Sequence, residues 1–226
     1  MPAKLKLTIL DWLEIALLTA PFIYLAAQWD KFPAWIPIHW NVHGQIDNWA
    51  RKPVGLLMLP LVNVALGALF RFLPFIDPKV RRSAGEERAR AVAVLRIVRA
   101  VMVLFMSGMF WVQMAITRGY PVKMNAFALN GCLLVFIVIG NYCAKLRPNY
   151  FTGIRTPWTL ENPETWRATH RIGGRILVFG SLLLLATEFF VPGQTFAYAF
   201  LAFVMGFTLW ACLYSWHHSR THPAPQ

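Results

Sequence analysis

The sequence predicts an all-α integral membrane protein with six transmembrane helices and with both chain termini in the cytosol (N-in/C-in). Apolar residues make up 57% of the 226 residues and charged residues only 14%, and the mean hydropathy is +0.47. This composition is far from that of soluble domains. Because lipid offers no partner to backbone N–H and C=O groups, long uninterrupted apolar runs cross it as helices rather than as barrel strands.

Six apolar runs have the length of about 20 residues that a helix needs to cross roughly 30 Å of hydrocarbon. They are Leu7–Ala27, Val54–Leu73, Ala93–Ile116, Asn125–Ala144, Gly174–Val191 and Gln194–Trp216. The first run follows two lysines, as the apolar part of a signal peptide does. However, Asp11 and Glu14 interrupt it and no small-residue cleavage site follows, so we predict an uncleaved anchor.

The distribution of basic residues predicts the orientation in the membrane. With a cytosolic N-terminus, 14 of the 22 Lys and Arg residues fall in cytosolic segments and five fall in outer loops. The other three, Arg71, Arg96 and Arg99, lie in spans near the cytosolic ends. We therefore predict a multi-pass protein of the cytoplasmic (inner) membrane. It has one membrane domain (1–216), an outer loop (28–53), two cytosolic loops (74–92 and 145–173) and a cytosolic tail (217–226).

The composition also excludes several classes of function. A bias of positive charge toward the cytosolic face, where anionic lipid lies, accounts for the net charge of +12, so we predict no direct nucleic-acid binding. Cys132, Cys143 and Cys212 lie in predicted spans without paired spacing, which favours small core residues. No nucleotide-binding glycine loop, HExxH motif or Ser/His/Asp order occurs. We therefore expect no cofactor, no catalytic residue and no enzyme.

The predicted outer loop carries Trp29, Trp35, Trp40 and Trp49, and indole rings favour the headgroup zone of a bilayer. We expect this loop to lie along the outer membrane surface.

Two interpretations fit the histidines of the same loop. On a helix, His39, His43 and Asp47 would share one face and could bind a transition metal. Pro37 and Gly44 instead favour a loop or turn, in which His39 and Asp47 hold the segment together by hydrogen bonds. We favour the hydrogen-bonded loop and predict no metal site.

Ionisable residues in two spans allow similar alternatives. Asp11 and Glu14 could form an ion or proton path with Asn63 and Arg71, or they could be solvated or pair with Arg96 or Arg99 at the cytosolic end. We favour the second, structural role. The adjacent His217 and His218 point in different directions on a helix, which favours interface residues over a metal or pH-sensing site.

The cytosolic loops contain helix signals. Glu86 and Arg90 have i,i+4 spacing, which predicts a basic helix that continues into the third span. Asn162, followed by Pro163 and an acidic residue, is a typical helix start.

The helix that starts there runs toward the fifth span. Trp166 and His170 share one of its faces. Gly173 and Gly174 mark a bend or a close packing contact on entry into the bilayer.

Two sets of polar and aromatic residues resemble known signatures. The first motif lies in the predicted outer loop and resembles that of a widespread bacterial domain of formerly unknown function; its residues are Pro37, His39, Trp40, Asn41, Gly44, Asp47, Trp49 and Lys52. The second motif lies in the second cytosolic loop and resembles that of the SdpI immunity protein family; its residues are Asn149, Gly153, Arg155, Thr156, Pro157, Trp158, Trp166 and His170. The order of the motifs and the six spans also fit that family. His43 departs from the family pattern, in which a small or amide residue is more usual.

The resemblance implies protection of a cell against a secreted peptide toxin that acts on the envelope. It also implies signalling, in which the toxin-engaged protein holds an ArsR-type repressor at the membrane. The expected partners are therefore membrane lipid, a secreted peptide toxin on the outer face and an ArsR-type repressor on the cytosolic face. The alternative is a membrane enzyme or transporter for a lipid headgroup or small ion, in which Arg155 and His170 bind a lipid phosphate.

Overall fold

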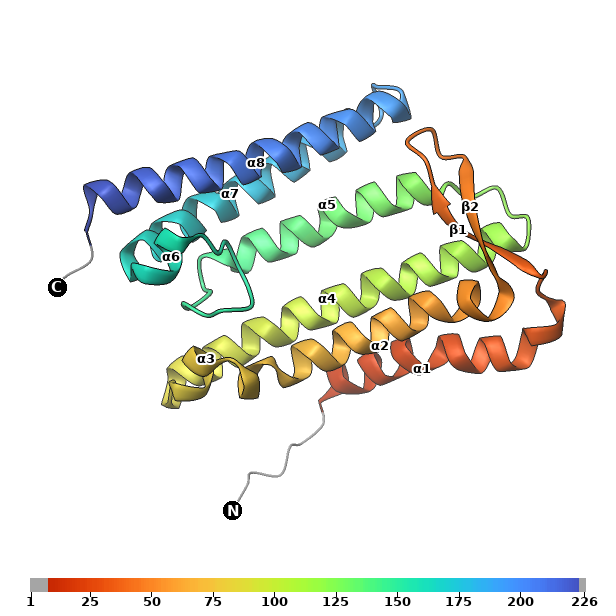
Figure 1. The fold of residues 1–226 in the computed structure, drawn as a ribbon, viewed down its shortest axis with the longest axis horizontal. Coiled ribbons are helices and arrows are strands. Elements are labelled where there is room, and N and C mark those ends of the chain that lie inside the picture. Colours follow the sequence, from red (N-terminus) through yellow and green to blue (C-terminus); the bar gives the residue numbers. More distant parts are fainter. Residues whose placement is uncertain (1–7, 224–226) are drawn as a thin grey trace, which may run out of the picture. The chain divides into compact units, whose positions relative to one another are not determined.

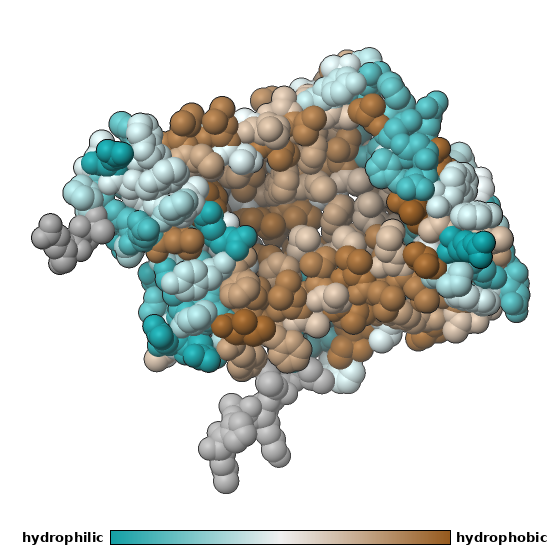
Figure 2. Space-filling model, viewed as in Figure 1, coloured by the Kyte–Doolittle hydropathy of each residue, from teal (hydrophilic) through white to brown (hydrophobic). Residues whose placement is uncertain are grey.

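The computed structural model describes residues 8–223, and six of the helices within this range are long and apolar enough to cross a membrane (Figure 1). They are α1 (Ile9–Gln28), α2 (Lys52–Ile76), α4 (Gly85–Thr117), α5 (Met124–Cys143), α7 (Pro163–Thr187) and α8 (Gly193–Thr221). Figure 2 shows apolar side chains over the visible middle stretches of the helices and polar side chains at the segments that join them. The predicted helical, six-span fold is therefore confirmed. Leu7, the two N-terminal lysines and residues 224–226 of the predicted tail lie outside the described residues.

Short elements connect the long helices. The 3₁₀ turn η1 (Trp29–Lys31) is followed by strands β1 (Trp35–Trp40) and β2 (Ile46–Arg51), while α3 (Pro78–Arg82) precedes α4 and α6 (Pro157–Glu161) precedes α7. The helix predicted from Glu86 and Arg90 begins at Gly85 and continues into the span, with the two side chains 2.7 Å apart. Asn162 caps α7 as predicted, because its side chain accepts from the backbone N–H groups of Glu164 and Thr165.

The chain forms two compact units. The first unit combines the part up to Leu69 with Arg99–Ala128, and the second combines Phe70–Val98 with the part from Leu129 onward. Helices α2, α4 and α5 each contribute residues to both units.

Hydrogen bonds between polar side chains and helix backbones tie the first unit together. Asn63 Nδ2 of α2 donates to the carbonyl of Val103, at 3.2 Å, and to Ser107 Oγ of α4, at 2.9 Å. Ser107 Oγ donates in turn to the carbonyl of Leu17 in α1, at 3.1 Å. Such interhelical bonds hold helices together where lipid supplies no hydrophobic drive between them.

The acidic residues of α1 form a buried ion cluster with α4. Arg99 Nη2 lies 2.7 Å from Glu14 Oε2 and 3.3 Å from Asp11 Oδ1, and all three side chains are at least nine-tenths buried. The predicted structural pairing with a basic residue of the third span is confirmed for Arg99. Because all three charged groups are buried, loss of one partner would leave an uncompensated charge in the protein interior, which is strongly destabilising.

The main difference from the expected fold is an antiparallel hairpin in the segment predicted as an irregular loop. Strand β1 pairs with β2 from Trp35 opposite Arg51 to Trp40 opposite Ile46, with irregular register on both sides of His39. Tryptophan and isoleucine, both common in strands, make up four of the six residues of β1, which favours a strand. Pro37 masks that pattern in the sequence, because proline within a run counts against a strand.

The second unit contains a close backbone contact between two helices at one of the predicted glycines. A Cβ atom on Gly174 of α7 would lie 2.5 Å from the carbonyl oxygen of Gly140 in α5, so glycine at these positions allows the two backbones to approach. Cys143 is buried, but Cys212 is exposed, so its predicted place in the core is wrong. It lies on an exposed part of α8.

Candidate functional sites

The base of the hairpin is fastened to two helices of the first unit. Gln113 Nε2 of α4 donates to the carbonyl of Pro37, at 2.9 Å, and to the carbonyl of Gly55 in α2, at 3.2 Å. Ile36 is fully buried, and it packs so closely on Gly55 that a Cβ atom added to Gly55 would lie 2.5 Å from the Ile36 Cβ. The hairpin is therefore a fixed part of the first unit rather than a loose connection.

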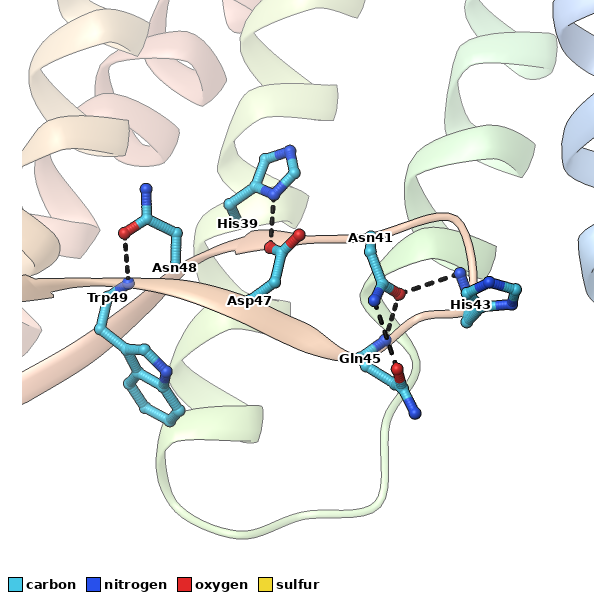
Figure 3. A network of polar contacts seen from close by, with 7 residues as sticks. All are labelled: His39, Asn41, His43, Gln45, Asp47, Asn48 and Trp49. Atoms are coloured by element: carbon cyan, nitrogen blue, oxygen red, sulfur yellow. Dashed lines mark hydrogen bonds and ion pairs between the residues drawn. The ribbon is translucent and has the colours of Figure 1, made fainter.

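His39 and Asp47 join the two strands on the exposed part of the hairpin. Figure 3 shows the two side chains turned toward one another. His39 Nδ1 lies 2.5 Å from Asp47 Oδ1. The predicted hydrogen bond between these residues is confirmed. Their side chains remain 64% and 42% exposed, so a ligand on the surface can reach them.

The turn between the strands is built by Asn41. Its Oδ1 accepts from the backbone N–H of His43, at 2.9 Å, and of Gln45, at 3.0 Å (Figure 3). Gly44 adopts a φ of +77°, a left-handed conformation that glycine adopts without steric cost. Because His39 lies in a strand and His43 in the turn, the helical face on which the metal alternative depended does not form.

Aromatic and basic side chains lie toward the base of the hairpin and in the residues directly beside it. Trp35 and Trp49 are about half exposed, at 54% and 48%. The Arg51 guanidinium lies 5.9 Å from the centre of the Trp35 ring. Lys52 Nζ lies 5.1 Å from the Trp29 ring. The hairpin thus presents indole rings and cations together on its surface, which suits a membrane interface or an amphipathic peptide.

The second motif is organised around a buried stack of two rings in the second unit. The rings of Trp166 and His170 lie 3.9 Å apart at an angle of 21°, and both residues are almost fully buried. Trp166 Nε1 donates to the carbonyl of Leu146, at 2.8 Å. His170 Nε2 accepts from the backbone N–H of Ile154, at 2.9 Å. His170 Nδ1 therefore carries the proton and donates to the Trp166 carbonyl, 2.8 Å away.

Gly153 fits only as glycine beside this stack. Its φ is +97°, and a Cβ atom there would overlap His170 Nε2. Gly153 thus leaves space for His170, whose Nε2 accepts the hydrogen bond from the backbone N–H of the next residue, Ile154.

Asn149 and Thr156 shape the rest of the segment. Asn149 Oδ1 accepts from the backbone N–H groups of Phe151 and Thr152, at 3.0 and 2.7 Å, which forms a tight local turn. Thr156 caps α6, with Pro157 in its first turn, and its hydroxyl bonds Ser215 Oγ of α8, at 2.9 Å. Most of the second motif is therefore structural.

Arg155 is the exposed cation of the second motif. Its Nη1 donates to the carbonyl of Tyr150, at 2.8 Å, and the side chain remains on the surface. His170 is enclosed, and both its ring nitrogens bond within the protein. The two residues therefore do not form the joint phosphate site of the enzyme or transporter alternative.

The sequence analysis missed Asp77, which orders the neighbouring segment. Its Oδ1 accepts from the N–H groups of Lys79 and Val80 at the start of α3, and its Oδ2 accepts from the N–H of Tyr150, at 2.7 Å. The local signal is an aspartate immediately before Pro78, a common helix start. Its bond to Tyr150 joins segments far apart in the chain.

These features define a polytopic membrane protein with two organised polar segments. Residues 16–64, which contain the hairpin, match the domain of unknown function DUF1648. Residues 145–215, which contain the second motif, match the SdpI/YfhL protein family. The chain is also similar to immunity protein SdpI of Bacillus subtilis (strain 168), with 21% identity over 208 residues that cover 92% of this chain and 95% of that protein.

No significant match to a solved structure was found. The resemblance predicted from the two motifs is confirmed: the chain is similar to the SdpI/YfhL family over its second motif and to immunity protein SdpI over most of its length.

Proposed function

We propose that this protein is a membrane immunity protein that protects its cell against a secreted amphipathic peptide toxin. Similarity over nearly the full length of immunity protein SdpI supports the class of function. The observation that carries the proposal is the fixed hairpin with its half-exposed Trp35 and Trp49. Indole rings at an interface bind apolar peptide side chains with little loss of hydration.

In this proposal the protein lies in the cytoplasmic (inner) membrane with both termini in the cytosol. The hairpin then faces the outside of the cell and the second motif faces the cytosol. The excess of Lys and Arg in the predicted cytosolic segments supports this orientation. The first motif then meets the toxin, and His39 and Asp47 hold the shape of the binding surface.

The cytosolic role that we propose is capture of an ArsR-type repressor by the segment around Arg155. The exposed guanidinium is available to a soluble partner, whereas Trp166 and His170 position the backbone beneath it. Toxin bound to the hairpin changes the affinity of this segment for the repressor, because binding at one site shifts the populations of the states that the other site recognises.

The immunity role is tested in the source cells. Deletion of the gene should sensitise the cells to spent medium of the undeleted strain, and the wild-type gene should restore survival. Genes carrying His39→Ala or Asp47→Ala should restore little survival at normal protein abundance. An exposed ion pair contributes about 0–1 kcal/mol to stability, so the loss is expected in binding rather than in folding. His43→Ala is the matched control and should protect as wild type does.

Survival of the deletion strain in spent medium would contradict the immunity role itself. Full protection by His39→Ala would contradict only the role of the hairpin.

The repressor role is tested separately with Arg155→Ala. This variant should protect against the toxin but should no longer recruit a fluorescent fusion of an ArsR-type repressor of the source cells to the membrane. Equal loss of protection and recruitment would contradict the proposed division between the two motifs.

A further inference from the structure

A cavity of about 750 Å³ lies in the second unit, and one of its lining residues, Leu146, also accepts the hydrogen bond from Trp166 Nε1 of the second motif. Its walls come from the start of α4, from the end of α5 with the residues that follow it, and from the first turns of α7. A second cavity of about 360 Å³ shares Glu87, Arg147 and Pro148 with it. The larger volume falls in the range of small-molecule sites.

The polar lining of the larger cavity is strongly basic. Four cations, Arg90, Lys145, Arg147 and Arg167, face one carboxylate, Glu87. Arg147 Nε lies 3.9 Å from Glu87 Oε1, which is too long for a hydrogen bond. Both side chains are about half exposed, so this pairing holds the guanidinium only weakly. Arg90 is paired with Glu86, which lies outside the lining, and Arg167 Nη2 lies 4.0 Å from Glu164 Oε1, another long and exposed pairing. Lys145, Arg147 and Arg167 are therefore the donors that the cavity offers to an anion.

The apolar part of the lining distinguishes a lipid from a soluble anion. Val94 and Leu146 are buried in the wall beside the cations, and Tyr142 lines the cavity as well. Each of the three helices that contribute is a candidate membrane span, and the basic residues lie where its apolar stretch begins or ends. A ligand here thus meets cations at headgroup level and apolar surface toward the acyl chains.

We infer that this cavity binds the headgroup of an anionic phospholipid, with its phosphodiester between Arg147 and Arg167. A guanidinium offers two parallel N–H donors to phosphate oxygens, which an ammonium group does not. Basic pockets between the ends of transmembrane helices recognise anionic headgroups in this way. The site is independent of the toxin and of the repressor.

The inference is tested on the full-length protein by native mass spectrometry in detergent with added phosphatidylglycerol or phosphatidylcholine. Wild-type protein should retain phosphatidylglycerol preferentially. In the triple variant Lys145→Gln/Arg147→Gln/Arg167→Gln, each neutralised cation should weaken that binding about fivefold. The matched triple variant Arg171→Gln/Arg175→Gln/Arg220→Gln removes the same charge outside the cavity lining and should behave close to wild type.

Glu87→Gln provides a test that misfolding cannot imitate. Removal of the one carboxylate of the lining should strengthen phosphatidylglycerol binding, because Arg147 then has no competing partner there. Equal retention by the cavity variant and wild type, or equal loss in both triple variants, would overturn the inference. So would unchanged or weaker binding by Glu87→Gln.

Two competitors distinguish other occupants. In lipid-free detergent, inorganic phosphate should bind much more weakly than phosphatidylglycerol, and equal binding would show a general anion site instead. Displacement of the lipid by an equimolar polyglutamate peptide would show a surface for an acidic protein instead. Either result would overturn the assignment to lipid.

Discussion

His170 occupies an enclosed position in which its ring and both ring nitrogens have partners. Substitution by alanine removes the stack on Trp166 and leaves the Ile154 N–H without its acceptor. We expect His170→Ala to lower the free energy of unfolding by about 3 kcal/mol. Thermal unfolding in detergent measures the loss. The exposed neighbour provides a control, since Arg171→Ala should change stability by about 0.5 kcal/mol or less.

Arg99 sets a second residue-scale prediction, because it neutralises buried carboxylates. Arg99→Gln should cost about 3–5 kcal/mol, since removal of one partner of a buried pair leaves an uncompensated charge. In the double variant Glu14→Gln/Arg99→Gln one of those charges is also gone. Its loss of stability should therefore be smaller than the sum of the two single losses. Additive losses in thermal unfolding would contradict direct coupling of the two side chains.

Sequence analysis identified the charged residues of this cluster but not their pairing. Arg96 and Arg99 are three residues apart on one helix, so the sequence alone did not show that Arg99 contacts α1. The packing of α1 against α4 brings Arg99 to both Asp11 and Glu14. Asp77 was missed for a related reason. Its bond to Tyr150 joins positions 73 residues apart, which no local pattern indicates. The hydrogen bond between His39 and Asp47 was predictable because the two residues are only eight positions apart within one loop.

At the scale of elements, the contact between α5 and α7 depends on paired glycines. Gly174→Ala places a methyl group against the Gly140 carbonyl and the Cys143 side chain, so the helices must separate. We expect a loss of about 2 kcal/mol, typical of overpacking. Gly206→Ala is the control, because nothing lies within 4 Å of a Cβ atom at that helical position. Equal stability of the two variants would show that the helices do not need this close approach.

The helices were predictable from sequence because a membrane span needs a long apolar run, and hydropathy measures that run directly. The predicted run Asn125–Ala144, for example, differs by one residue at each end from α5. The hairpin was not predictable in the same way. Its strands have six residues each, include Pro37 and carry register irregularities, so neither run length nor alternation identifies them.

At the scale of the whole molecule, the positive-inside bias predicts opposite membrane faces for the two motifs. Single cysteines at Gln45 and Glu161, both exposed positions, test this after replacement of the three native cysteines. A membrane-impermeant maleimide on intact cells should label Gln45→Cys at once, and it should label Glu161→Cys only after permeabilisation. The reverse pattern would place the hairpin in the cytosol and would contradict a direct contact with a secreted toxin.

Strand β1 also limits how a peptide can be bound. Exposed strands commonly recruit peptides by backbone pairing, which extends the sheet and tolerates many sequences. Pro37 has no N–H group, and Gln113 already engages its carbonyl, so backbone pairing along β1 is interrupted at this residue. A peptide that binds along β1 is therefore recognised mainly through its side chains. If the proposed toxin binds there, resistance depends on the toxin's sequence, and a few toxin substitutions are enough to escape it.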